Sequence, residues 1–327
     1  MNTFLLGDRG TEVHDIQQRL VTLGEHIEPS ELDGTYGPST ERAVRAFQER
    51  RSLRVDGRVG PDTWGQLVEA GYRLGDRTLY LRAPFQRGDD VRSLQRKLNA
   101  LGFDAGKEDG LFGARTDRAI REFQRNVGHT SDGIVGEETL TTLERLRPSA
   151  SGPSRAVVRE EETVRSMRSS IEGQVVAIDL PRETASHAIG RALADELAAA
   201  GAKPVLLPVE DDDAAPSSSA RSANELSAAV CVSLHLPTAP GESTMRCSYF
   251  GNSSTHSPAG KHIAELIAAA IERDVGCPAA VDRLTGAILR ETRMPAVQID
   301  LPHDVDPSAG SRIALAIADG LTRFFEG

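Results

Sequence analysis

The chain repeats itself in its first half, and this repeat constrains the fold more than any other feature. Val13, Leu20, Leu23 and Gly24 recur at Val91, Leu98, Leu101 and Gly102. After a two-residue change in length, Gly34, Gly37, Thr40, Ala43, Phe47, Gln48, Asp56, Gly57, Gly60, Thr63 and Leu67 recur at Gly110, Gly113, Thr116, Ala119, Phe123, Gln124, Asp132, Gly133, Gly136, Thr139 and Leu143. Self-similarity in register indicates a repeated structural unit. We therefore expect two copies of one small domain.

Each copy is predicted to form three short helices. Residues 13–24 and 91–102 carry apolar side chains at helical spacing and end at a glycine that can adopt a left-handed cap. Residues 39–53 and 114–128 predict the second helix of each copy. An Asp-Gly turn and a final short helix follow in both copies. The repeats should therefore be all-α.

These residues resemble the type 1 peptidoglycan-binding domain, a three-helix module, over about Leu5 to Leu146. The resemblance implies peptidoglycan fragments or precursors as ligands. We expect the aromatic residues of both copies to build the cores, namely Tyr36, Phe47, Phe112 and Phe123. Three polar residues are expected on the surface, where they could contact a glycan or a peptide: Gln48, Gln124 and Arg51.

The composition excludes some classes of function. A formal charge of -10 and a pI near 5.4 argue against nucleic-acid binding, which needs a basic excess to neutralise phosphates. No window approaches about 18 uninterrupted apolar residues, so we expect no transmembrane segment. The amino terminus has no basic region before a long apolar run, which predicts a cytoplasmic protein. Three cysteines without Cys-x-x-Cys spacing fit buried thiols in a reducing compartment: Cys231, Cys247 and Cys277.

The sequence predicts a multi-domain protein. Two peptidoglycan-binding modules should occupy residues 1–74 and 75–147, and a polar, proline-bearing start marks a linker at 148–173. Residues 174–327 alternate between strand and helix patterns, which predicts an α/β domain with a mostly parallel central sheet and helices on both faces. The expected strands are 175–179, 204–209, 230–236, 244–251 and 296–300, and the expected helices are 186–201, 220–228, 259–276 and 308–325.

The third domain resembles the zinc-dependent N-acetylmuramoyl-L-alanine amidase family, amidase type 3. The resemblance is carried by the strand at 175–179, a Ser-x-His end at 233–235, and the run LTGAILRETRMPAVQIDLP at 284–302. An enzyme of this kind needs three protein ligands for zinc, an open fourth position for water, and a carboxylate that takes the proton of that water.

The resemblance places Arg182 at the first ligand position, where a guanidinium offers no lone pair to a metal. Glu183 is the nearby candidate for the second ligand, and His235 retains the third. The catalytic glutamate is replaced by Asp300, whose shorter side chain would cost about a hundredfold in rate if a metal were present. We therefore expect no catalytic residue and no metal or other cofactor, only a vestigial pocket.

One alternative keeps zinc in the domain. His187 or His303 could turn inward and join Glu183, His235 and Asp300 as an atypical ligand set. The protein would then be a zinc-dependent amidase. A lone histidine at a strand end is more often a hydrogen-bonded structural residue than a ligand, which favours the metal-free interpretation.

Two repeats without a leader, an arginine in the first ligand position and Asp300 in the catalytic position are together similar to cytoplasmic, actinobacterial pseudo-amidases. That similarity implies a non-catalytic regulator that activates UDP-N-acetylglucosamine 1-carboxyvinyltransferase (MurA) in cell-wall precursor synthesis. It also implies control by a membrane serine/threonine kinase, with a forkhead-associated protein as a further partner. The chain stops soon after Phe325, so we expect the phosphoacceptor tail of that group to be missing. A plain peptidoglycan-binding module would need export, for which the start of the chain offers no route.

Overall fold

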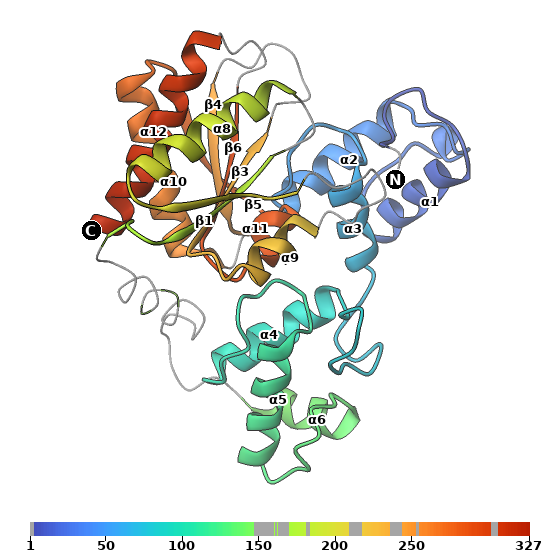
Figure 1. Cartoon of the computed structure of the whole chain (residues 1–327). Helices are drawn as coiled ribbons and strands as arrows, with labels where there is room; N and C mark the ends of the chain where they lie inside the picture. Colours follow the sequence, from blue (N-terminus) through green and yellow to red (C-terminus); the bar gives the residue numbers. More distant parts are fainter. Residues whose placement is uncertain are drawn as a thin grey trace. The chain divides into compact units, whose positions relative to one another are not determined.

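A computed structural model describes residues 3–146, 160, 162, 170–180, 184–208, 218–235, 244–252, 255–301 and 307–327 (Figure 1). The chain divides into two compact units. One contains Asn2–Gln48 and Gly57–Arg159, and the other contains Met1, Glu49–Asp56 and Glu160–Gly327. Most of the linker predicted at 148–173 lies outside the described residues. No helix among the described residues is both long enough and apolar enough to cross a bilayer.

Each repeat forms three α-helices, as predicted. The first contains α1 (Thr11–Thr22), a short 3-10 helix η1 (Pro29–Glu31), α2 (Pro38–Arg50) and α3 (Pro61–Glu69), and the second contains α4 (Asp89–Ala100), α5 (Ala114–Asn126) and α6 (Glu137–Arg145). Gly24 and Gly102 follow α1 and α4 with φ values of 88° and 92°. Only glycine adopts this left-handed conformation without a Cβ penalty, which confirms the predicted helix ends.

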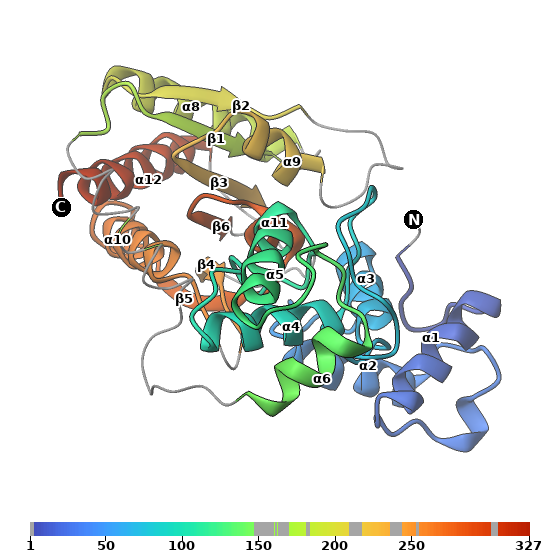
Figure 2. The same ribbon diagram turned by 90° about the horizontal axis from the view of Figure 1, so that it is seen from below.

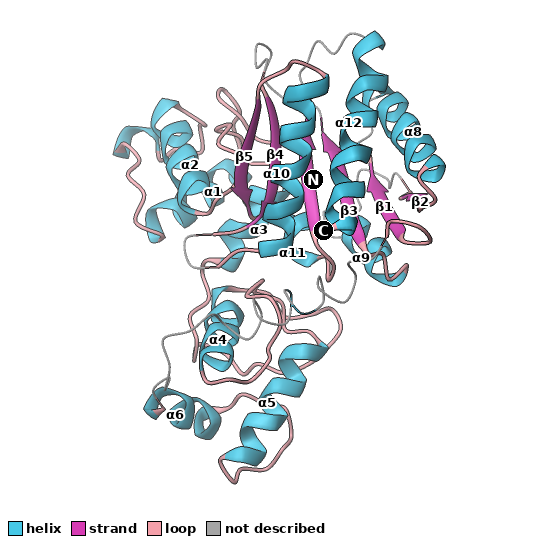
Figure 3. Cartoon of the chain, turned by 90° about the vertical axis from the view of Figure 1, so that its left-hand side faces the viewer, coloured by secondary structure: helices cyan, strands magenta, loops and turns pink. Residues whose placement is uncertain are grey.

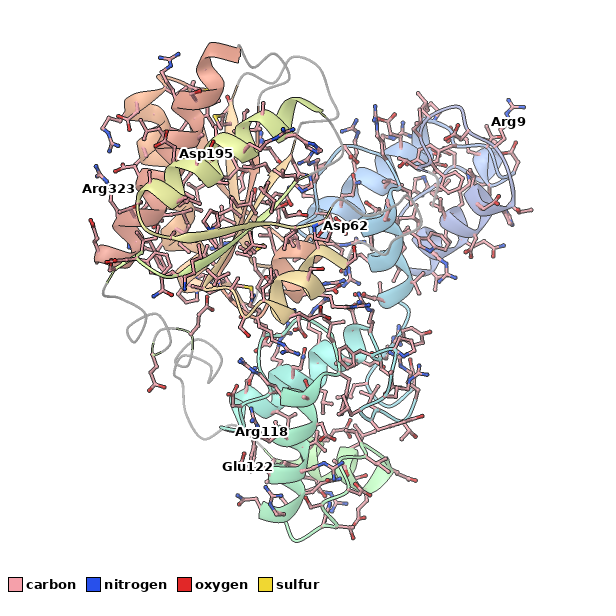
Figure 4. The ribbon with its side chains drawn as sticks, in the orientation of Figure 1. Arg9, Asp62, Arg118, Glu122, Asp195 and Arg323 are labelled. Atoms are coloured by element: carbon pink, nitrogen blue, oxygen red, sulfur yellow. The ribbon has the colours of Figure 1, made fainter. Side chains whose placement is uncertain are left out.

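The predicted aromatic cores are confirmed. Tyr36 and Phe47 are buried in the first repeat, and Phe112 and Phe123 in the second. Phe103 adds an edge-to-face contact with Phe123, with ring centroids 5.5 Å apart. The opposite face of these helices is polar, and Figure 4 shows Arg118 and Glu122 of α5 pointing outward. The apolar stripe of each helix therefore faces a small core of its own repeat.

The expectation that Gln48 and Gln124 lie on the surface is wrong. Their relative exposures are 1% and 2%. Gln48 accepts a hydrogen bond from the Gly57 backbone N–H at 2.9 Å and donates to the Arg58 carbonyl at 2.8 Å. Gln124 accepts from the Gly133 N–H at 2.9 Å in the same way. These amides satisfy buried backbone groups of the Asp-Gly turns, so they are not available to a glycan.

The C-terminal unit is built on a six-stranded sheet with the order β2-β1-β3-β6-β4-β5 (Figure 3). Its strands are β1 (Val175–Asp179), β2 (Lys203–Leu206), β3 (Val230–His235), β4 (Met245–Phe250), β5 (Ala279–Leu284) and β6 (Ala296–Asp300). Every neighbouring pair is parallel except β4 with β6. The prediction of a mostly parallel sheet is confirmed, and β5 is an additional edge strand that the sequence pattern did not predict.

Helices cover both faces of the sheet, as predicted (Figure 2). On one face, α8 (Thr184–Ala199), α10 (Pro258–Asp274) and α12 (Pro307–Glu326) pack on side chains such as Val176 and Val232. On the other, α9 (Ser218–Glu225) and α11 (Ala287–Glu291) pack on Ala177, Cys231 and Ala296. Successive strand residues point to opposite faces, which produces this division. On the outer side of α12, Arg323 points away from the sheet and pairs with Asp319 at 2.9 Å (Figure 4).

The cysteines provide a first test of this packing. Cys231 and Cys247 are buried, Cys277 is partly exposed, and none forms a disulfide. Burial, together with the nearby Asp300 charge, raises the pKa of Cys247 to about 12. Because the thiolate is the reactive form, native protein at pH 8 should gain a single N-ethylmaleimide adduct, at Cys277, whereas unfolded protein should gain three. Intact-mass measurement distinguishes the two, and a second adduct on native protein would contradict the packing.

Candidate functional site

The carboxyl ends of β1, β3 and β6 bring four polar residues to one edge of the sheet. In the strand register, Asp179 lies opposite Ser233, and His235 lies opposite Asp300. The three strands are parallel, and open α/β sheets place their chemistry at this edge. The structure therefore brings together His235 and Asp300, which the sequence singled out, and adds Asp179 and Ser233.

A short hydrogen-bond chain fixes His235. The Ser233 hydroxyl donates to Asp179 Oδ2 at 2.6 Å, and His235 Nε2 lies 2.9 Å from Ser233 Oγ. A hydroxyl has one proton and a carboxylate only accepts, so the proton of Ser233 is used on Asp179. His235 Nε2 must then carry a hydrogen and donate it to Ser233. The imidazole is thereby held in one orientation, and Nδ1 is the ring nitrogen that takes no part in this hydrogen-bond chain.

Asp300 is engaged by two donors. The guanidinium Nη2 of Arg54 forms an ion pair with Asp300 Oδ1, and Gln298 Nε2 donates to the same oxygen at 3.1 Å. The Asp300 side chain is 8% exposed and that of Arg54 is 31% exposed. Both residues belong to the C-terminal unit. A permanently charged guanidinium therefore neutralises the carboxylate that stands in the catalytic position.

His235 and Asp300 can be compared with the ligands that a zinc ion requires. His235 fits one ligand, because a metal-bound imidazole normally donates its other N–H to a neighbour, as Nε2 does here. Asp300 does not fit, because its Oδ1 already accepts from a cation that would repel a second one. Among the described residues, no three His, Cys, Asp or Glu side chains lie close enough together to hold a metal. Among the described residues, Asp300 is therefore better suited to pair with a guanidinium than to bind a zinc ion.

The remaining predicted site residues have different outcomes. Arg182, Glu183 and His303 lie outside the described residues. His187 lies on α8 and is partly exposed. The atypical ligand set of His187, Glu183, His235 and Asp300 therefore stays a prediction. Sequence reasoning missed Arg54, although one signal was present, since the equivalent residue of the second repeat is a threonine.

Two family models match the chain. A model of the peptidoglycan binding domain matches residues 9–67 and 87–143, and a model of N-acetylmuramoyl-L-alanine amidase matches residues 172–320. The N-acetylmuramoyl-L-alanine amidase CwlM of Mycobacterium tuberculosis is 34% identical over 352 residues, which cover 96% of this chain and 86% of the relative. The chain belongs to the N-acetylmuramoyl-L-alanine amidase family. It has the domain architecture of CwlM, which confirms the two repeats and the amidase-like domain.

Other members of the amidase family match part of the chain. The N-acetylmuramoyl-L-alanine amidase CwlL of Bacillus licheniformis is 32% identical over 160 residues, covering 43% of this chain and 44% of the relative. Among solved structures, the amidase of Clostridium difficile 630 is 19% identical with a TM-score of 0.41, covering 48% of this chain and 98% of its own. The amidase Ami1 of Mycobacterium smegmatis is 16% identical with a TM-score of 0.40, covering 48% and 99%.

Proposed function

We propose that this chain is a non-catalytic regulator of peptidoglycan precursor synthesis, built on an amidase scaffold that no longer holds zinc. The observation that carries the proposal is the ion pair between Arg54 and Asp300. Amidase chemistry needs a carboxylate that accepts a proton from metal-bound water. An oxygen that already accepts from a guanidinium and from Gln298 is poorly placed for that role.

The sequence around the first ligand position supports the same proposal. Arg182 stands where the family has a histidine, and its guanidinium has no lone pair for a metal. Two arginines and a shortened carboxylate are thus assigned to one vestigial site. Such a site is suited to binding rather than to hydrolysis, since the guanidinium of Arg54 beside Asp300 disfavours the entry of a divalent metal.

We further propose that the protein acts in the cytoplasm by binding an enzyme of precursor synthesis, with UDP-N-acetylglucosamine 1-carboxyvinyltransferase (MurA) as the partner. A serine/threonine kinase or a forkhead-associated protein is proposed as a further partner, and peptidoglycan fragments or precursors are proposed ligands of the repeats. The formal net charge of -10 supports a protein partner over a nucleic acid.

The alternative is a zinc-dependent amidase with an atypical ligand set drawn from His187, Glu183, His235 and Asp300. One observation favours it. His235 donates Nε2–H to Ser233, so Nδ1 is the ring nitrogen that could bind a metal. This alternative predicts that His235→Ala abolishes muramoyl-peptide hydrolysis.

A reconstituted assay tests the proposed function. Purified MurA is combined with the full-length chain at increasing concentration, and enolpyruvyl transfer is followed by phosphate release. We expect a saturable increase in turnover and co-elution of the two proteins in size-exclusion chromatography. If turnover stays constant and the proteins elute separately, MurA is not the partner.

A further inference from the structure

A segment of the first repeat contacts the site at the carboxyl ends of β1, β3 and β6, although it is far from these strands in the sequence. Residues Glu49–Asp56 belong to the C-terminal unit. Thr285 holds this segment twice, because its hydroxyl donates to the Arg51 carbonyl at 2.6 Å and its backbone N–H donates to the Ser52 carbonyl at 2.8 Å. Thr285 is only 4% exposed, so these bonds are shielded from water. Arg54 adds the ion pair with Asp300.

The second repeat shows that this turn does not need those residues for its own fold. In the register of the repeats, Ser52 corresponds to Gly128, and Arg54 corresponds to Thr130. Gly128 has a φ of 79°, which glycine adopts freely, whereas Ser52 is held at 52°. A non-glycine residue remains in this region only when its surroundings fix it. The first repeat thus departs from the second at the positions that contact Thr285 and Asp300.

Arg54 pairs with a carboxylate that is largely buried. Asp300 lies at the end of β6 beside His235, and its side chain is 8% exposed while Arg54 supplies the charge partner. Gln298 donates to the same oxygen from the same strand. If Arg54 leaves, a buried carboxylate with a polar neighbour is presented to solvent. The group that replaces Arg54 best is one with the same charge and planar N–H donors.

We propose that residues 51–55 form a latch, in which Arg54 occupies a guanidinium site at Asp300 and shields that carboxylate. In the latched state, Asp300 is closed to ligands. In the released state, it accepts the arginine of a partner protein. The latch and the proposed function share the Arg54–Asp300 ion pair, but labelling of Asp300 tests the latch without MurA, so the two can fail separately.

Chemical labelling of Asp300 tests the latch in the full-length chain. Arg54→Thr gives the first repeat the residue that the second repeat carries, so the turn should still fold, and Trp64 fluorescence checks that it does. Carbodiimide then couples glycine ethyl ester to accessible carboxylates, and peptide mass spectrometry measures the rate at Asp300. We expect Arg54→Thr to raise that rate about fivefold. A partly exposed ion pair changes the equilibrium between the shielded and the accessible carboxylate by about this factor.

Two controls separate the latch from a general loss of charge or of structure. Arg45→Thr removes an arginine of the same repeat that pairs with Glu41 at 2.9 Å, and it should leave labelling of Asp300 unchanged. Methylguanidinium chloride should suppress the gain in Arg54→Thr, whereas sodium chloride at equal concentration should not. An unchanged labelling rate in Arg54→Thr, or a gain that methylguanidinium does not reduce, would overturn the proposal.

Discussion

Gln17→Ala is expected to destabilise the first repeat by about 3 kcal/mol, because the amide of Gln17 satisfies several buried groups at once. Its Nε2 donates to the Glu31 carbonyl at 2.6 Å and to the Thr35 carbonyl at 2.9 Å, and its Oε1 accepts from the Gly34 N–H at 3.2 Å. Gln17 is fully buried. Removing the amide leaves these backbone groups without their partner and leaves a cavity.

The neighbouring residue supplies a matched control. Gln18 lies on the same helix, α1, but it is exposed, so Gln18→Ala should change the stability by less than about 0.5 kcal/mol. The chain has a single tryptophan, Trp64, on α3, and Arg19 of α1 lies over its ring at 5.3 Å. Urea unfolding followed by Trp64 fluorescence therefore reports on this repeat. Equal shifts for both variants would contradict the assignment of Gln17 as an internal hydrogen-bonding residue.

Gly320→Ala should destabilise the C-terminal unit by about 2 kcal/mol, although alanine is normally the better helix former. A Cβ at Gly320 would lie 2.8 Å from Ile267 Cα and 2.9 Å from Ile267 N. Both are backbone atoms of α10, so no side-chain rotation relieves the clash. The helices α10 and α12 would have to move apart within a close-packed core.

Gly310 is the control for this substitution because it is a buried glycine on the same helix. A Cβ there would meet only Ile189 Cγ1, at 3.4 Å, so Gly310→Ala should be neutral or stabilising by up to about 1 kcal/mol. Pulsed thiol labelling in urea measures both variants, since Cys231 and Cys247 are buried in this unit and react only when it unfolds. A stability of Gly320→Ala equal to that of Gly310→Ala would contradict the close helix contact.

Local patterns predicted most of the fold. The repeats were visible as identities in register, and β1, β3 and β6 as apolar runs that end in polar residues. The edge strand β5 was missed because its residues, AAVDRL, are mostly half-buried and show no clear alternation. Gln48 and Gln124 were assigned to the surface because their polarity is typical of it, and only the three-dimensional turn shows that buried backbone groups need them.

The site was predicted only in part. His235 and Asp300 were assigned from motifs, and the structure places them opposite each other. The two-residue spacing of Ser233 and His235 puts both on one face of a strand, so their contact could have been predicted. The pairing of Arg54 with Asp300 could not, because 246 residues separate the two and no local pattern links them.

The zinc content of the purified chain tests the central claim most directly. Elemental mass spectrometry measures the zinc, and cleavage of muramoyl-peptide amide bonds is assayed on the same protein. A pocket in which a guanidinium neutralises Asp300 should hold far less than one zinc per chain, even after incubation with zinc and dialysis, and should release no peptide. One tightly bound zinc per chain, lost together with hydrolytic activity in His235→Ala, would contradict the account.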